Sequence, residues 1–247
     1  MPPGSHLLVP LAIAAAATSV IVFLRYLVAC SFFAYCTKVR MPRLYQDRWP
    51  QIRREVGWSA ISAVIYGIPA GIALWAWAEH GQTLIYTDPS AYPVWWLPLS
   101  ALVYLAIQDG WFYLTHRLMH APALFRACHY VHHQSNPATG WASMSFHPWE
   151  ALTMALLVPV LLFVIPIHLA ALAFVMLVMT VFGITNHLGW EIWPSRLVKG
   201  RLGMAIITAS HHDRHHRDFR CNYGLYFRFW DHVCRTDRGI GSFGHGR

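Results

Sequence analysis

The chain has 247 residues, of which 56% are hydrophobic and only 12% are charged. A soluble domain carries roughly 25% charged residues, so the composition excludes most soluble folds and indicates an integral membrane protein. The formal net charge is +8. The five cysteines are odd in number and form no CxxC pair, which argues against a disulfide scaffold or a zinc ribbon.

The first two apolar segments predict membrane-spanning helices. The first runs from His6 past Leu24, and the basic residues that follow it give the wrong charge order for a cleaved signal peptide. The second, Gly57 to Ala78, is free of charge and long enough to cross the hydrocarbon at about 1.5 Å per residue. Residues 79–90 are polar and predict a turn.

Three further spans are expected. One opens at Tyr92, and its helical pattern continues past Asp109 towards His120. Residues 151–190 contain no Asp, Glu, Lys or Arg, and Pro166 divides them into an antiparallel hairpin of 151–165 and 167–186.

These segments predict an all-α fold, an integral membrane helical bundle of four to five spans with a cytosolic histidine-rich helical cap. We expect one domain over residues 1–247. It would have its first three spans in 6–120, cap segments in 121–150 and 188–247, and a transmembrane hairpin in 151–187.

The basic residues predict the orientation. All 19 Lys and Arg fall in three places, namely 25–54, Arg117 with Arg126, and 196–247. With five crossings these places lie on one side, which the positive-inside rule assigns to the cytoplasm, with the N-terminus outside. Topology then accounts for the net charge, and no nucleic acid partner is expected.

Histidine is unusually frequent, with 16 residues, and eight of them form three clusters. On a helix, positions i, i+3 and i+4 share a face, so an HxxxH pattern aims two imidazoles at one point and an HxxHH pattern aims three. The clusters are His116-x-x-x-His120, His129-x-x-His132-His133 and His212-x-x-His215-His216.

His187, at the end of the last span, is a plausible ninth ligand on the same side of the membrane. A closed structural zinc site takes four ligands, so eight or nine nitrogens suit two ions.

The identity of the metal is a separate question, since imidazole suits zinc, copper, iron and nickel. Iron that activates O₂ is favoured, because hydrocarbon offers no polar bond for a Lewis acid to attack. Zinc hydrolysis of a lipid head group is the alternative, with Glu150 or Glu191 as the base.

Other polar residues are expected to support the site. Asp109 lies seven residues before His116, inside an apolar span, and we expect it to orient a ligand imidazole through the ring N–H that the metal does not use. Whether His147, His211 or Glu191 also binds metal is left open. Phe112, with Trp111 and Trp141, is expected to line a lipid cavity below the metals.

The order of these motifs resembles the fatty acid hydroxylase/sterol desaturase superfamily over roughly residues 108–237. The shared pattern comprises Asp109, the three histidine clusters, His147-Pro148-x-Glu150, His187, Asn222-Tyr223-Gly224, Trp230-Asp231 and Thr236. The tract from His211 to His216 is similar to C4-methylsterol oxidases and some bacterial carotenoid ring hydroxylases. Some members have a second histidine four residues from the one that matches His187, where this chain has Gly183 and Glu191.

The resemblance implies a non-haem di-iron membrane oxygenase that uses O₂ and two electrons to hydroxylate, or desaturate, an unactivated C–H bond of a lipid. It implies nine metal ligands, namely His116, His120, His129, His132, His133, His187, His212, His215 and His216.

We expect a lipid-soluble substrate (carotenoid, sterol or acyl lipid) and a separate electron donor, either a ferredoxin or a b-type cytochrome, because no electron-transfer module is visible in the sequence. A preference for Arg over Lys favours a bacterial inner membrane as the location. Oxidative demethylation on the same site stays open. A metal transporter and a haem- or quinone-binding anchor are rival hypotheses from other classes.

Overall fold

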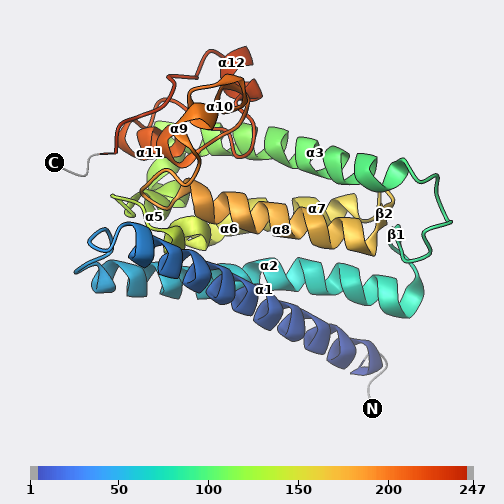
Figure 1. Ribbon diagram of the computed structural model, residues 1–247. Helices are drawn as coiled ribbons and strands as arrows, with labels where there is room; N and C mark the ends of the chain where they lie inside the picture. Colours follow the sequence, from blue (N-terminus) through green and yellow to red (C-terminus); the bar gives the residue numbers. More distant parts are fainter. Residues whose placement is uncertain (1–4, 244–247) are drawn as a thin grey trace.

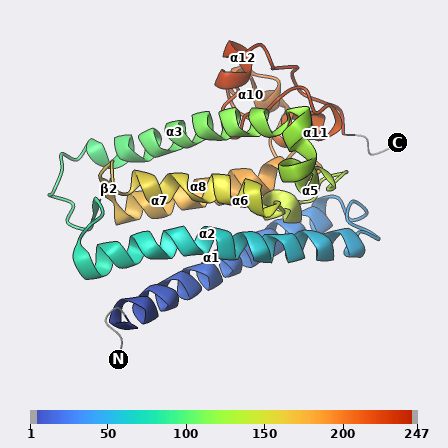
Figure 2. The same ribbon diagram turned by 180° about the vertical axis from the view of Figure 1, so that it is seen from behind.

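The computed structural model describes residues 5–243, and most of them are helical. Residues 1–4 and 244–247 of the expected domain, Arg247 among them, lie outside the described residues. The long axis of the molecule is formed by six helices that run along one another (Figures 1 and 2). They are α1 (Ser5–Arg40), α2 (Trp49–His80), α3 (Trp96–Met119), α6 (Pro148–Ala155), α7 (Leu157–Leu161) and α8 (Leu169–Asn186).

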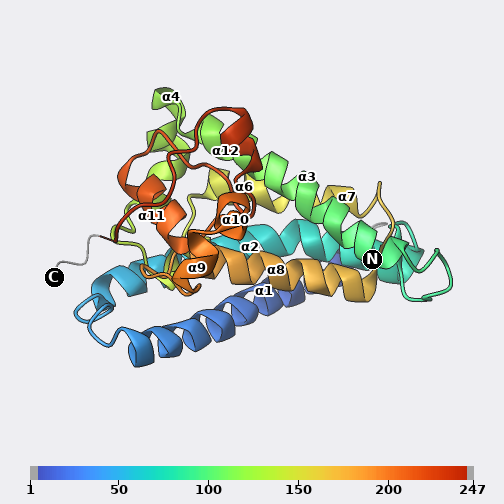
Figure 3. The ribbon, with the colours of Figure 1, turned by 45° about the horizontal axis from the view of Figure 1, so that its top comes forward.

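Short helical elements gather at one end of this bundle, where α1, α3 and α8 end and where α2 and α6 begin (Figures 1 and 3). Those before α6 are α4 (Pro122–Leu124), the π-helical turn η1 (Phe125–His129), α5 (Tyr130–His133) and the 3₁₀ helix η2 (Gly140–Met144). Those after α8 are α9 (Ser195–Val198), α10 (Arg201–Ala205), α11 (Ala209–Arg217) and α12 (Phe229–Val233). The prediction of a helical membrane bundle with a histidine-rich cap is therefore confirmed.

Within residues 5–243, three helices are long and apolar enough to cross a membrane, namely Leu7–Arg40, Trp49–His80 and Leu169–Asn186. The other two predicted spans differ from them. α3 has polar residues, Gln108 and Asp109, at its centre. The apolar segment Pro148–Leu161 is shorter, and at about 1.5 Å per residue it covers about 21 Å, less than the roughly 30 Å of hydrocarbon.

Helices α1 and α2 pack closely against each other, because small residues at their contact let the two backbones approach. A Cβ atom added to Gly71 of α2 would lie 2.6 Å from the Cα of Ala15 in α1, and one added to Gly67 would collide with Ser19. Glycines spaced four apart let two membrane helices approach until their backbones touch. This contact fixes how α1 lies against the rest of the bundle.

A short pair of strands closes the opposite end, which the all-α prediction did not include. β1 (Ile85–Tyr86) pairs in parallel with β2 (Ile167–His168), with Ile85 opposite Ile167. The strands satisfy backbone groups where the α2–α3 connection meets the turn between α7 and α8, since a buried turn must pair its polar backbone groups.

Tyrosines near the first segment attach the cap to the bundle. The Tyr26 hydroxyl donates a hydrogen bond to the carbonyl of Trp141 in η2 at 2.8 Å. Beyond α1, the Tyr45 hydroxyl donates to the carbonyl of Leu188, just after α8, at 3.0 Å and accepts from the Gly140 N–H at 2.9 Å. The end of α8 and the start of η2 are thereby fixed relative to each other.

One basic residue does not lie where the charge pattern placed it. Arg25 was grouped with the residues at the cytosolic end of the first span, but α1 continues unbroken to Arg40, 15 residues further on. At about 1.5 Å per residue, Arg25 is about 22 Å from that end of the helix. It therefore lies near the middle of α1 and not at the end of this helix.

Candidate metal centre

The structure brings the nine predicted histidines together from four separate pieces of chain. Their ring nitrogens form two groups in which the nitrogens lie within 4.8 Å of one another. The five-histidine group consists of His116, His120, His129, His133 and His215, and the four-histidine group consists of His132, His187, His212 and His216. Only His120 is half-buried, and the other eight are buried.

Helical geometry sorts each HxxHH motif between the two groups, which corrects the expectation that each motif aims three rings at one point. His129 and His133, four residues apart, face the five-histidine group, whereas His132 faces the four-histidine group. Adjacent residues on a helix point about 100° apart because there are 3.6 residues per turn. The pair His215 and His216 in α11 is divided in the same way. Each motif thus links the two groups.

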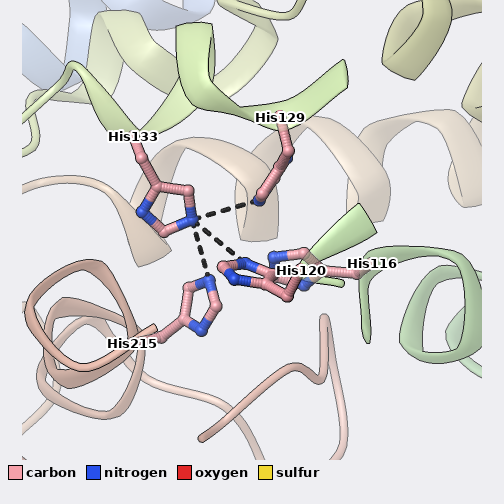
Figure 4. Close-up of side chains that lie close together, drawn as sticks. All are labelled: His116, His120, His129, His133 and His215. Atoms are coloured by element: carbon pink, nitrogen blue, oxygen red, sulfur yellow. Dashed lines mark hydrogen bonds between the residues drawn. The ribbon is translucent and has the colours of Figure 1, made fainter. Parts of the chain in front are cut away.

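His133 lies at the middle of the five-histidine group (Figure 4). Its Nε2 atom is 3.2 Å from the Nε2 of His120, 3.1 Å from that of His129 and 3.2 Å from that of His215. A ring nitrogen carries at most one proton, so these contacts cannot all be ordinary hydrogen bonds. Nitrogens that bind one ion at about 2.0–2.1 Å lie about 3 Å apart when their bonds meet near a right angle. The spacing therefore matches ligands of one ion.

The four-histidine group has the same spacing. The Nε2 atom of His187 is 3.1 Å from the Nε2 of His132 and 3.0 Å from that of His212. His212 is in turn 3.2 Å from His216, again between Nε2 atoms. In the five-histidine group, the buried Nε2 of His116 has no hydrogen-bond partner among the described residues. Both donor sets therefore fit metal ions.

Acceptors behind the rings fix which nitrogen faces inwards. A carbonyl oxygen can only accept, so each Nδ1 that contacts one must carry the proton, which leaves Nε2 free to bind metal. Three such contacts are His116 Nδ1 to the Tyr223 carbonyl at 2.8 Å, His187 Nδ1 to the Gly183 carbonyl at 2.6 Å and His215 Nδ1 to the Cys221 carbonyl at 2.7 Å. The carboxylate of Glu150 lies 2.9 Å from the Nδ1 of His129, a close polar contact that does not have hydrogen-bond geometry.

The electrostatic surroundings keep the imidazoles in the form that binds metal. Burial, together with neighbouring imidazoles, lowers the pKa of the buried cap histidines well below the ordinary value. Burial also lowers the pKa of His120 and of His187 to about 4. All are therefore neutral near pH 7, and a neutral imidazole has a lone pair to donate.

Asp109 does not orient a ligand imidazole, and this expectation is corrected. Its Oδ1 atom accepts hydrogen bonds from the backbone N–H groups of Tyr226 at 2.8 Å and Phe227 at 3.2 Å. The carboxylate therefore fixes α3 to the loop before α12, and it is Glu150 that contacts a histidine. In the sequence, the feature that pointed to Glu150 was its place in the His147-Pro148-x-Glu150 motif, which forms the first turn of α6.

The three residues left open as extra ligands have other partners. The Nδ1 of His147 accepts from the N–H of Trp149 at the start of α6. Glu191 accepts from the backbone N–H and the hydroxyl of Ser210 at 3.1 and 2.7 Å. His211 lies 3.6 Å from the carboxylate of Asp237. None of the three belongs to either group.

Sequence reasoning gave no role to Asp231, yet it fixes the loop whose Tyr223 carbonyl contacts His116. Its carboxylate accepts hydrogen bonds from the backbone N–H groups of Tyr223 and Gly224, each at 2.9 Å, and from the Thr236 hydroxyl at 2.7 Å. These residues belong to the tail motif identified in the sequence, but only the tertiary contact shows that they position the carbonyl that His116 meets.

A cavity of about 100 Å³, the proximal cavity, adjoins the centre. Two of its wall residues touch ligand rings: Phe112 lies 4.9 Å from the ring of His116, and Phe146 lies 5.2 Å from that of His132. Phe112 thus lines a cavity as expected, whereas Trp111 and Trp141 are not in its wall. An apolar hollow against the imidazoles suits a hydrocarbon.

Comparison with known proteins identifies the family. The family model for fatty acid hydroxylase matches residues 101–236, more than half of the chain. The chain therefore belongs to the fatty acid hydroxylase family, as its motifs indicated. No solved structure matches it.

Curated relatives carry the names of sterol-modifying enzymes. The chain is 30% identical to Delta(7)-sterol 5(6)-desaturase ERG3B of Gibberella zeae over 64% of this chain and 48% of the relative. It is 29% identical to lathosterol oxidase of Mus musculus (78% and 63%) and 29% identical to C-4 methylsterol oxidase erg25 of Schizosaccharomyces pombe (66% and 53%). The chain thus spans less than two thirds of the length of each. These relatives are eukaryotic and give no support to the expected bacterial inner membrane.

Proposed function

We propose that this member of the fatty acid hydroxylase family is a membrane-bound non-haem di-iron oxygenase. It uses O₂ and two electrons to hydroxylate an unactivated C–H bond of a lipid-soluble substrate. The observation that carries this proposal is the division of nine imidazole nitrogens into two neighbouring groups of five and four. Iron is among the metals that a nitrogen-only donor set suits.

Each group would hold one iron. In the five-histidine group, His133 would be the central ligand, because its Nε2 contacts three other ring nitrogens. In the four-histidine group, His187 and His212 are central for the same reason. Iron in these groups would supply the activation of O₂ that a hydrocarbon substrate requires.

The residues of the chain itself orient the histidine rings, line the proximal cavity and place the substrate. Backbone carbonyls keep the proton on the Nδ1 of His116, His187 and His215, so the Nε2 of each of these rings is free to bind metal. Phe112 and Phe146 pack against the rings of His116 and His132 and give this part of the proximal cavity an apolar wall. A lipid that enters this cavity from the bilayer therefore presents a C–H bond next to the imidazoles.

A sterol is the favoured substrate class because the relatives are named for sterols, and carotenoids and acyl lipids remain alternatives. Desaturation is the second candidate reaction, and oxidative demethylation the third. The relative named a Delta(7)-sterol 5(6)-desaturase supports desaturation as a candidate, and the relative named a C-4 methylsterol oxidase supports oxidative demethylation. All three reactions require the same donor set and differ in product.

We also propose that the metal end of the bundle faces the cytoplasm and receives electrons from a separate ferredoxin or b-type cytochrome. The ends of α1 and α3 and the start of α2 carry basic residues, and all three lie at the metal end (Figure 1). Exposed arginines of the cap, such as Arg220 and Arg235, would attract an acidic donor.

Anaerobic purification tests the proposal. We expect about two irons per chain in wild-type protein, and a hydroxylated or desaturated lipid when O₂, a reduced donor and membrane lipid are supplied and the lipids are analysed by mass spectrometry. The variant His133→Ala should lose iron and product together. The matched control His80→Ala, at the far end of α2, should retain both.

Three results would count against the proposal. One is a single tightly bound zinc with no iron-dependent product. Another is a His133→Ala variant that keeps wild-type iron content. The third is metal flux into proteoliposomes without any lipid product, which would support the rival hypothesis of a transporter.

A further inference from the structure

Arg25, near the middle of α1, borders two cavities. It lines the proximal cavity beside the histidines and also a second one of about 210 Å³, the distal cavity. The two cavities share four wall residues, namely Arg25, Tyr66, Met154 and Met179. The distal cavity is otherwise lined by residues of α1, α2, α6, α7 and α8, most of them apolar. Arg25 therefore stands where the two hollows meet.

Arg25 has no counter-charge. Among the described residues, no carboxylate lies within ion-pair distance of its guanidinium, and it makes no hydrogen bond. No Asp or Glu lines either cavity. Its side chain cannot reach the end of the bundle, because Arg40 is 15 residues further along the same helix. A charge in such a place is unfavourable unless something pairs with it.

Tyr66 of α2 is the second polar group at this junction, and its hydroxyl likewise makes no hydrogen bond with a described residue. The other tyrosines of the proximal cavity are engaged. The hydroxyl of Tyr26 donates to the Trp141 carbonyl, and that of Tyr226 donates to Gln108 at 2.5 Å. Arg25 and Tyr66 thus present hydrogen-bond donors with no protein acceptor.

We propose that Arg25 and Tyr66 bind the polar end of the lipid substrate. This inference rests on the proposed function, because it assigns the same cavity to the substrate. The guanidinium is always charged and offers five N–H donors, so the matching group is an oxygen that accepts hydrogen bonds. The hydroxyl or keto oxygen of a sterol and the carboxylate of an acyl lipid share this chemistry, and a carboxylate would in addition neutralise the charge.

The position of this pair determines which end of the lipid reacts. The proximal cavity touches Arg25 at one part of its wall and the ligand-contacting rings of Phe112 and Phe146 at another. A lipid anchored through its oxygen at Arg25 therefore presents a carbon away from that oxygen to the histidines. Pure hydrocarbons have no acceptor for the pair and should bind more weakly.

Lipid binding to the iron-loaded protein in detergent tests the proposal without turnover. The probe is radiolabelled palmitic acid, with hexadecane and cholesterol as competitors. We expect Arg25→Met to weaken palmitate binding by about 10-fold or more and Tyr66→Phe to weaken it by a smaller factor, because each removes donors to a charged acceptor. The matched control Arg40→Met, on the same helix but outside both cavities, should bind as the wild type does.

The competitors distinguish the source of the oxygen. Stronger competition by cholesterol than by hexadecane, lost in Arg25→Met, would assign the site to a sterol hydroxyl and support the pair as an acceptor-oxygen site. Competition by hexadecane as strong as that by unlabelled palmitate in the wild type, or unchanged binding of radiolabelled palmitate in Arg25→Met, overturns the proposal. If Arg25→Met does not fold, unchanged binding in both Arg25→Lys and Tyr66→Phe has the same meaning. Iron content measured in the same samples reports separately on the proposed function.

Discussion

Replacing Glu150 with alanine removes the one carboxylate that contacts a proposed ligand. Its Oε1 atom lies 2.9 Å from the Nδ1 of His129, and both side chains are almost fully buried. The change removes the polar group that packs against Nδ1 and allows the ring of His129 to turn. Loss of a group that positions a metal-binding histidine typically costs roughly 10- to 100-fold in metal affinity.

The measurement is a competition titration of Fe²⁺ against a chelator, performed anaerobically. We expect Glu150→Ala to weaken one of the two iron sites by about 10- to 100-fold and to leave the other nearly unchanged, because His129 belongs to the five-histidine group alone. Glu150→Gln should lose less, since its amide keeps the shape of the side chain and an oxygen beside Nδ1. Glu191→Ala is the control, because Glu191 contacts Ser210 and no ligand.

A Glu150→Ala protein that binds both irons as tightly as the wild type would refute this role of Glu150. Equal weakening of both sites would refute it as well, because the loss would then reflect a general loosening of the cap. If Glu191→Ala weakened iron binding as much as Glu150→Ala does, the loss of affinity would not depend on contact with a histidine of either group.

Three further predictions follow from the same contacts. Gly71→Ala should lower the thermal unfolding temperature in detergent, because its Cβ would lie 2.6 Å from a facing backbone atom, whereas Gly57→Ala meets nothing within 4 Å and should be neutral. By elemental analysis, His212→Ala should lose about one iron and His211→Ala none, although the two are adjacent. Burial alone would raise the pKa of Asp237, but hydrogen bonds from its neighbours outweigh it and hold this pKa well below the usual range. Its ion pair should therefore stabilise the cap above about pH 4 and less as the pH falls further, so Asp237→Asn should lower the unfolding temperature at pH 7 more than at pH 3.

The sequence by itself determined the class of fold and which nine histidines come together in the structure. Hydropathy and helical spacing are local properties, so a charge-free run predicts a membrane helix and a pair such as His116 and His120 predicts two rings on one face. The placement of basic residues also predicted that the clusters share one end of the bundle, as they do in the structure.

Only the tertiary structure decided how these parts meet. The assignment of His132 and His133 to different groups, the contact of Glu150 with a ligand ring and the backbone partners of Asp109 all depend on segments far apart in the chain. The same holds for Arg25, whose charge pattern indicated a helix end although it faces two cavities inside the bundle. Local periodicity gives the direction of a side chain on its own helix, but its partner is set by which other helix packs there.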